Sequence, residues 1–205
     1  MSFILRFIKV WILSLFGRRN YTLLHESRVK LRVWPNDLDL NIHVNNGRYL
    51  TLMDLGRMDL MFRSGAIRLW LAKGLQPLVG FSMCRHFKAL KVFQPFTLKT
   101  KVLAWDEKWI YFEQRFESGG MLYALGVVKG LMAGKQGPIP TADLMKILNL
   151  NEPSPEIPAY VKDWLSAERK AIDMLKAERI PIEKTGRDST DIAERKPVQE
   201  TRRDG

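Results

Sequence analysis

Residues 39–50 read DLNIHVNNGRYL, and this stretch decides the fold because it joins a loop to the start of a long helix. Asn45 and Asn46 are of a residue type that caps helix N-termini, so one of them is expected to begin a helix. The next stretch, residues 47–63 (GRYLTLMDLGRMDLMFR), contains no proline and places apolar residues at helical spacing on nearly every side. A helix that is apolar nearly all round is typical of one buried inside a domain.

Strand-like segments lie on both sides of this helix. Residues 26–34 (ESRVKLRVW) alternate apolar and polar side chains, which predicts a half-buried strand. The last three of the later strand-like segments are joined by short turns at 106–108 and 118–120, so antiparallel neighbours are expected. One helix wrapped by one antiparallel sheet is an α+β layout. The later segments expected to be strands are 78–90, 97–105, 109–117 and 121–135.

Composition divides the 205 residues into four parts: an apolar and basic N-terminal helix, one folded domain, a helical extension and a charged tail. Within the extension, residues 141–149 and 159–179 have helical patterns, and a proline-rich linker separates them. The tail has almost no large apolar residue, so we expect it to be disordered. The four parts span residues 1–19, 20–137, 138–180 and 181–205.

The N-terminal segment 2–16 (SFILRFIKVWILSLF) is too short and too charged to span a bilayer, which takes about 20 apolar residues. Arg6 and Lys9 lie three apart and share one helical face. With Trp11 as an anchor, they predict a helix in a membrane interface, with both basic residues at lipid headgroups. Deleting residues 1–19 should then leave a folded domain. A cleaved signal peptide is one alternative, although no suitable cleavage site follows. Packing on the protein's own core or on a dimer partner is another.

The formal net charge of +11 suits an anionic partner such as a membrane surface or a phosphate-rich coenzyme, although solubility alone also explains it. The single cysteine, Cys84, excludes an internal disulfide and points to a reducing, cytoplasmic compartment. The histidines lack the spacing of zinc sites, so no metal is expected. Trp105, Trp109, Tyr111 and Phe112 alternate along strands, so packing explains them better than stacking on nucleic acid. No nucleic-acid partner is therefore expected.

The residue types at 39–46 provide the parts of an acyl-transfer site. Backbone N–H groups at a helix N-terminus carry partial positive charge, so those at Asn45 and Asn46 are the candidate oxyanion site. Asp39 is the candidate carboxylate, which would activate water or attack a carbonyl itself. His43 would orient the loop or the water. The simpler alternatives are that Asp39 only caps a turn and that His43 only donates a structural hydrogen bond.

The pattern DxxxHVNNxxYL over residues 39–50 resembles the signature of hotdog thioesterases related to hydroxybenzoyl-CoA thioesterase and the long-chain acyl-CoA thioesterases of bacteria. The resemblance implies a hotdog fold, in which an antiparallel sheet wraps a long central helix. It also implies dimers whose active sites lie between subunits. In that family the residue matching Asp39 is the catalytic carboxylate. The substrate would be an acyl-CoA, so no separate cofactor is expected.

Several segments are also similar to one subgroup of this family, called thioesterase superfamily member six. That subgroup begins with an apolar, membrane-associated segment, which the resemblance extends to residues 1–19. One departure from the wider family is Ile42, which stands where many relatives have glycine. Because Ile42 is β-branched, we expect it to exclude a positive φ. The similar segments are residues 35–50, 84–96, 102–118 and 163–168.

Six further residues are candidates to bind the acyl-CoA. Tyr49 completes the family pattern, and the pair Asp54 and Arg57 stands where the family often has ExxR. Three basic residues on or beside a strand would receive the coenzyme A phosphates. Alternatively, the helical pair is a plain ion pair and the basic residues are a solvated face. The six are Tyr49, Asp54, Arg57, Arg85, Lys88 and Lys91.

Two functions are open on this evidence. The first is an enzyme that hydrolyses a fatty or aryl acyl-CoA to the free acid and coenzyme A. The alternative is a catalytically inactive, membrane-associated hotdog protein that binds acyl chains or a protein partner. A homodimer, or a dimer of dimers, is expected because a buried type of helix has only one sheet to cover it. Asp37 fits the motif worse than Asp39, so the same replacement at Asp37 is expected to cost little in the rate of hydrolysis.

Overall fold

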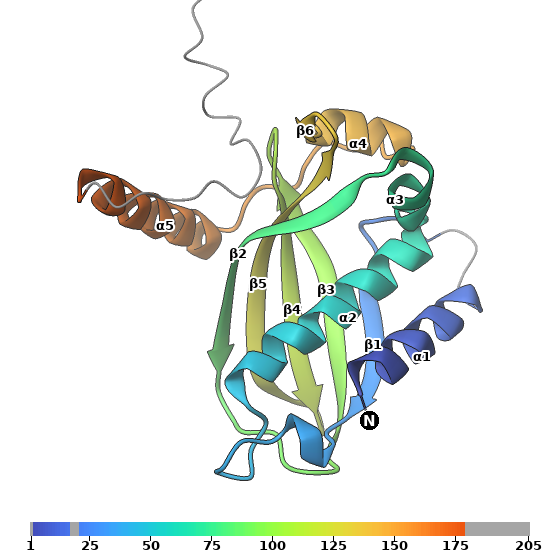
Figure 1. Ribbon diagram of the computed structural model, residues 1–205, viewed down its shortest axis with the longest axis vertical. Helices are drawn as coiled ribbons and strands as arrows, with labels where there is room; N and C mark the ends of the chain where they lie inside the picture. Colours follow the sequence, from blue (N-terminus) through green and yellow to red (C-terminus); the bar gives the residue numbers. More distant parts are fainter. Residues whose placement is uncertain (1, 17–20, 179–205) are drawn as a thin grey trace, which may run out of the picture.

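The computed structural model, which describes residues 2–16 and 21–178, is an antiparallel sheet curved around one long helix (Figure 1). The strand order is β1-β3-β4-β5-β2, and β6 pairs with β5 off this path. Helix α2 crosses the concave face of the sheet. This arrangement confirms the α+β hotdog fold predicted from the sequence. The strands are β1 (Ser27–Arg32), β2 (Gln76–His86), β3 (Pro95–Trp105), β4 (Ile110–Ser118), β5 (Met121–Gly134) and β6 (Gly137–Pro138). The helices are α1 (Phe3–Leu15), the 3-10 turn η1 (Pro35–Asp37), α2 (Asn46–Ser64), α3 (Ile67–Lys73), α4 (Thr141–Ile147) and α5 (Ala159–Ala177).

Helix α2 begins and ends at residues suited to those positions. The Asn45 side chain accepts a hydrogen bond from the Gly47 N–H at 2.9 Å, and Gly65 ends the helix with a φ of 77°. In the middle of the helix, a β-carbon at Gly56 would lie 2.2 Å from Thr100 Oγ1. The absence of a side chain at Gly56 therefore lets α2 lie close against the sheet.

The strands follow the expected alternation, with buried and exposed residues taking turns along β1. Gly119 and Gly120 both have positive φ in the tight turn between β4 and β5. Between β3 and β4, Asp106 Oδ1 accepts hydrogen bonds from the N–H groups of Lys108 and Trp109. These turns make β3, β4 and β5 antiparallel neighbours, as the connection lengths predicted. Strand β2 instead pairs with β5, so β1 and β2 form the two edges of the sheet.

Helix α1 packs beside α2 and β1, with Arg6 and Val10 each 1% exposed. The prediction that Arg6 lies at lipid headgroups is therefore wrong, because its guanidinium forms a buried ion pair with Asp37. This packing makes α1 part of the core, which argues against the expectation that the domain folds without residues 1–19. In the described part of the chain, no helix is long and apolar enough to cross a membrane. Helix α1 and its C-cap nevertheless carry exposed apolar residues, namely Ile4, Leu5, Ile8, Trp11, Ile12, Leu13, Leu15 and Phe16.

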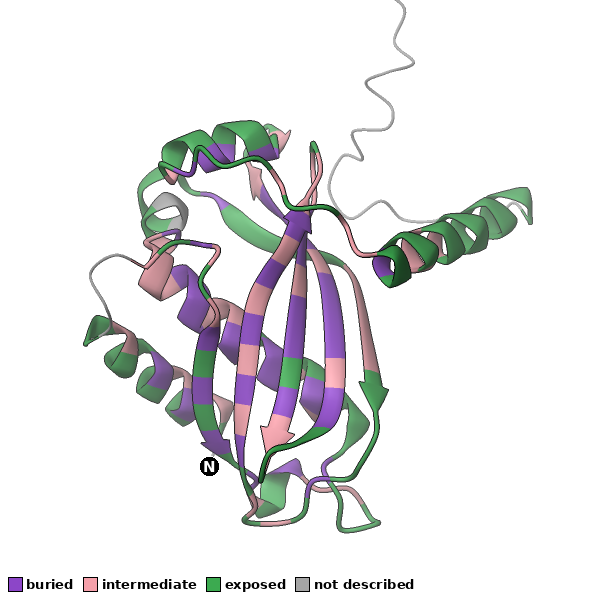
Figure 2. Ribbon diagram, turned by 180° about the vertical axis from the view of Figure 1, so that it is seen from behind, coloured by how far each residue is buried: buried purple, intermediate pink, exposed green. Residues whose placement is uncertain are grey.

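The two C-terminal helices take different positions. Helix α4 contributes Leu144 and Met145 to a core cluster at one end of α2. The first half of α5 packs on the sheet through Val161, which lies in a cluster with Ala104, Tyr111 and Val127. The second half projects away from the body of the protein (Figure 2). The charged tail expected at 181–205 lies outside the described residues.

Candidate functional site

The motif loop is a short turn that Asp39 holds closed. The Asp39 N–H donates to the His43 carbonyl at 2.8 Å, and Leu38 pairs with Val44 across the turn. The Asp39 carboxylate accepts hydrogen bonds from the N–H groups of Asn41 at 2.9 Å and His43 at 3.4 Å. Asp39 is half-buried, whereas His43 is exposed. Asp39 thus caps its own turn and is fixed just before the helix start, and its catalytic role stays a prediction.

The conformation of Ile42 differs from the one expected. Its φ is 58°, in the left-handed region that a β-branched residue was expected to exclude. The turn accommodates it because the Ile42 N–H donates to the Asp39 carbonyl at 3.1 Å and the side chain is 68% exposed. The chain therefore makes the same kind of turn that a glycine would make, but with backbone strain.

The start of α2 faces solvent at the motif end of the molecule. Asn45 is the N-cap, and Asn46 is the first helical residue, which resolves the choice that the sequence left open. Both residues are exposed. Backbone N–H groups in the first turn of a helix have no acceptor within the helix. Here the Asn45 N–H is donated to the Asp37 carbonyl and the Gly47 N–H to the Asn45 side chain, which leaves the Asn46 N–H as the candidate to polarise a carbonyl oxygen. The position therefore suits an oxyanion site.

The buried residue Asp37 holds this helix start in place through hydrogen bonds of its carboxylate and its carbonyl. Its carboxylate, 1% exposed, accepts from Arg6 Nη1 at 2.8 Å, from Arg48 Nη2 at 3.1 Å and from the Trp34 N–H at 2.8 Å. Its carbonyl accepts the Asn45 N–H at 2.8 Å. Burial by itself would raise the pKa of Asp37, but these hydrogen bonds and the Arg6 charge hold the pKa below its usual range. Replacing Asp37 should therefore destabilise the fold, whereas its small expected effect on the rate of hydrolysis stays a prediction.

The loop after β2 brings basic residues to the same end of the molecule. The backbones of Lys91 and His43 pair in an isolated antiparallel β-bridge, and the Val44 N–H donates to the Leu90 carbonyl at 3.2 Å. Lys88 is exposed, with its ammonium 5.6 Å from the centre of the Tyr123 ring. The guanidinium of Arg85, also exposed, lies 5.9 Å from the Phe87 ring centre. The three predicted phosphate ligands, which are Arg85, Lys88 and Lys91, thus lie on the strand end and loop that adjoin the motif.

Tyr49 is the one predicted substrate-binding residue that the structure removes from the site. Its side chain is 2% exposed and packs edge-on against Phe116 and His86, with ring centres 5.0 and 4.6 Å apart. Burial raises the pKa of its phenol. Tyr49 is therefore a core residue of α2, and the prediction that it binds substrate is wrong.

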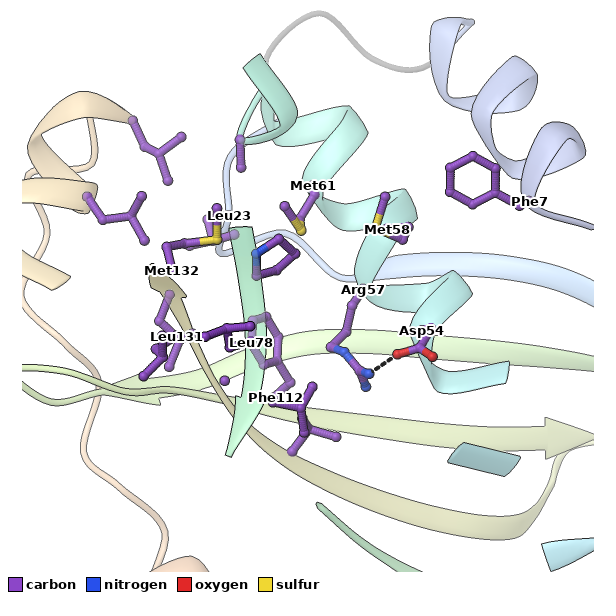
Figure 3. A pocket seen from close by; sticks show the side chains of 18 of the residues that line it. Phe7, Leu23, Asp54, Arg57, Met58, Met61, Leu78, Phe112, Leu131 and Met132 are labelled. Atoms are coloured by element: carbon purple, nitrogen blue, oxygen red, sulfur yellow. Dashed lines mark hydrogen bonds and ion pairs between the residues drawn. The ribbon is translucent and has the colours of Figure 1, made fainter. Parts of the chain in front are cut away.

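A cavity of about 300 Å³ lies farther along α2 (Figure 3). Apolar side chains from α2, β2, β4 and β5 line most of it, and Phe7 of α1 lies at one side. Its charged lining residues are Asp54 and Arg57, which form an ion pair. Arg57 Nη1 also donates to Gln114 Oε1 at 2.6 Å. Asp54 is eight residues beyond Asn46, so the cavity begins about 12 Å from the helix start.

Sequence reasoning found the ion pair but missed most residues of this cavity. They come from strands and helices far apart in the chain, for example Leu78, Phe112 and Leu131. The sequence did contain one signal of a cavity, because α2 is apolar on more sides than a single sheet covers. Met58 and Met61 of α2 line the cavity together with side chains of the sheet.

Comparison with known proteins gives a consistent result. The model of the thioesterase-like superfamily matches residues 33–165. Protein THEM6 of Danio rerio is 30% identical over 76% of this chain and 76% of its own length. A probable thioesterase of Saccharomyces cerevisiae is 27% identical over 57% of this chain and 52% of its own. Among solved structures, the probable thioesterase YbaW of Escherichia coli superposes with a TM-score of 0.56 at 16% identity, covering 60% of this chain and 96% of that one.

Proposed function

Because the chain belongs to the thioesterase-like superfamily, we propose that it hydrolyses an acyl-CoA thioester to the free acid and coenzyme A. The observation that carries the proposal is the exposed start of α2, with the Asp39 turn directly before it. The Asn46 N–H, at the first residue of the helix, would hold the oxyanion that forms on the thioester carbonyl, because the Asn45 N–H is donated to the Asp37 carbonyl. Asp39 would activate a water molecule or attack the carbonyl, and His43 would orient the loop.

The rest of the substrate would extend to both sides of this point. The coenzyme A phosphates would meet Arg85, Lys88 and Lys91, which adjoin the motif. The acyl chain would run along α2 for about 12 Å to reach the apolar cavity. A cavity of about 300 Å³ is at the small end of ligand pockets, which suits one chain and no bulky ring system.

The proposal is tested by measuring free thiol release from a panel of acyl-CoAs that differ in chain length. Met58→Trp would fill part of the cavity, so KM should rise for long chains more than for short ones. Leu71→Trp, at an exposed position outside the cavity, is the matched control. Equal effects on long and short chains would show that the acyl group binds elsewhere.

Asp54 is a second carboxylate that could serve the reaction, because its side chain is 52% exposed and lines the cavity. Comparing kcat of Asp54→Asn with kcat of Asp39→Asn shows which of the two carboxylates serves the reaction. If Asp39 is the base, Asp54→Asn should change kcat by only a few-fold. A loss of 10²–10⁴-fold in Asp54→Asn, with Asp39→Asn nearly active, would move the chemistry to the cavity.

The exposed apolar side of α1 favours the alternative function, a catalytically inactive protein that binds acyl chains at a membrane. Three exposed basic residues of β1 lie near it, and Lys9 of α1 donates to the Lys30 carbonyl at 3.4 Å. An apolar helix face beside basic residues suits an anionic bilayer. A protein that binds a fluorescent fatty acid and anionic vesicles, but releases no thiol from any acyl-CoA, would fit this alternative. The three residues are Arg28, Lys30 and Arg32.

We also propose that the protein is a homodimer paired along β2. Within the described residues, β2 pairs with β5 alone, so the other edge of an 11-residue strand is open. Leu78 and Val79 on this strand are 40% and 53% exposed. An open strand edge of this length is a ready partner for a second copy. Light scattering should give twice the chain mass of 23.8 kDa.

A further inference from the structure

Helix α5 crosses the sheet toward its open edge. At its start, the Tyr160 hydroxyl donates to Glu113 Oε2 of β4 at 3.1 Å. One turn later, the ring of Trp164 packs at right angles on Phe81 of β2, with centres 5.6 Å apart. Glu168 then pairs with Lys129 of β5 at 2.7 Å. These contacts hold the first half of α5 on β4, β5 and β2, and the rest of the helix runs past the edge strand β2 in both views (Figures 1 and 2).

The apolar stripe of α5 continues after the sheet has ended. Stripe positions recur at alternating spacings of four and three residues, which places them on one helical face. The early members are buried or half-buried on the sheet, whereas Ile172 and Leu175 are 38% and 41% exposed. Every residue from 169 to 178 is exposed. The same face that packs on this sheet is thus presented beyond its edge. The apolar members of the stripe are Val161, Leu165, Ile172 and Leu175, and the charged Glu168 occupies the remaining position.

The projecting part has the length needed to lie over a neighbouring sheet. Residues 170–177 span about 12 Å at 1.5 Å per residue. Strands in a sheet are about 4.8 Å apart, so this part of α5 reaches across about two further strands. Those strands are absent from the single chain but would be supplied by a second copy paired along β2.

We propose that the projecting half of α5 clasps a second copy of this chain, with Ile172 and Leu175 packed on the partner's outer face at its β2 strand. The proposal rests on the proposed β2 dimer and extends it. On that face Phe81 of β2 is covered by Trp164 of its own chain, and Met83, two residues on and on the same side of the strand, is left to receive the partner's helix. Two-fold symmetry makes the contact reciprocal, so each copy's α5 would cover the other copy's edge. The α5 stripe of each copy would therefore pack on the β2 strand of the other copy.

The test compares two charge-changing variants of the full chain by sedimentation equilibrium. Ile172→Glu/Leu175→Glu places two carboxylates on the stripe. Lys170→Glu changes the charge by the same amount from the opposite face of the helix. The stripe variant should raise the dimer dissociation constant at least about tenfold, and the control should leave it within about twofold. Circular dichroism checks that α5 remains helical in both.

A photo-crosslinker at position 172 provides a second measurement. Mixed isotope-labelled and unlabelled copies should yield crosslinks between chains, mapping to residues 81–85 or to α5. A dimer unchanged in the stripe variant, with crosslinks only inside one chain, overturns the clasp and leaves the β2 dimer standing. A monomeric wild type overturns both the clasp and the β2 dimer. Thiol release from an acyl-CoA, measured separately, tests the proposed hydrolysis. If the stripe variant lost binding to anionic vesicles but kept its dimer, α5 would serve a lipid surface and the clasp would be wrong.

Discussion

Arg6→Met tests the buried ion pair that joins α1 to the motif. Removing one member of a buried pair costs about 3–5 kcal/mol, because the other charge stays buried without its partner. Asp37 would keep Arg48, which is 26% exposed, and the Trp34 N–H, so the lower end of about 3 kcal/mol is expected. For a chain of this size, about 3 kcal/mol lowers Tm by about 6–12 °C.

The assay is thermal unfolding of the full chain at pH 7, with Lys9→Met as the matched control. Lys9 is an exposed residue of the same helix, so its replacement should shift Tm by less than about 2 °C. Methionine keeps most of the apolar stem of either side chain, so the comparison isolates the charge.

The pH dependence gives an independent check on the same pair. The pKa of Asp37 is lowered in the folded protein, so its stabilisation is present above the unfolded pKa of about 3.9 and is lost as the pH falls through the folded value. The gap in unfolding free energy between wild type and Arg6→Met should therefore be full at pH 7 and shrink below about pH 4. If Arg6→Met melted within 2 °C of Lys9→Met at pH 7, the reasoning about α1 would be refuted.

Three further changes have defined expected outcomes. Asn45→Ala removes the side-chain cap of α2 and should cost about 1 kcal/mol in urea unfolding, and an unchanged midpoint would argue against Asn45 as the cap. Ile42→Gly relieves a left-handed residue, which costs about 1–2 kcal/mol, so Tm should rise slightly unless the turn relaxes in solution. Trp11→Glu should weaken binding to anionic vesicles while leaving Tm nearly unchanged, since the side chain is 48% exposed, and undiminished binding would exclude this face of α1 as the lipid contact.

The sequence predicted the elements well because their signals are local. The alternation in residues 26–34 and the apolar pattern of residues 47–63 correspond to β1 and α2. Short turns predicted which of the later strands are neighbours. The place of β2 at the far edge was not predicted, because no turn of fixed length joins it to its partner β5. Strand order of this kind depends on contacts that a local pattern does not contain.

Only the part of the site that is contiguous in sequence was predicted, because long-range contacts leave no local pattern. The helix start and the turn before it are contiguous in sequence, so the motif located them together. Arg6 appeared to be a surface residue beside Lys9 because its partner, Asp37, lies 31 residues away. Tyr49 belongs to the family pattern, yet the pattern does not distinguish a residue that packs in the core from one that contacts substrate.

The kinetics of Asp39→Asn test the central proposal most directly. The change keeps the size of the side chain and the oxygen that accepts from the N–H groups of Asn41 and His43, and it removes the negative charge. Asp143→Asn, on the exposed surface of α4, is the matched control. On the best acyl-CoA, kcat/KM should fall 10²–10⁴-fold in Asp39→Asn and stay within about twofold in the control, with Tm of both close to wild type. Activity of Asp39→Asn within a few-fold of wild type would contradict the assignment of Asp39 as the reacting carboxylate.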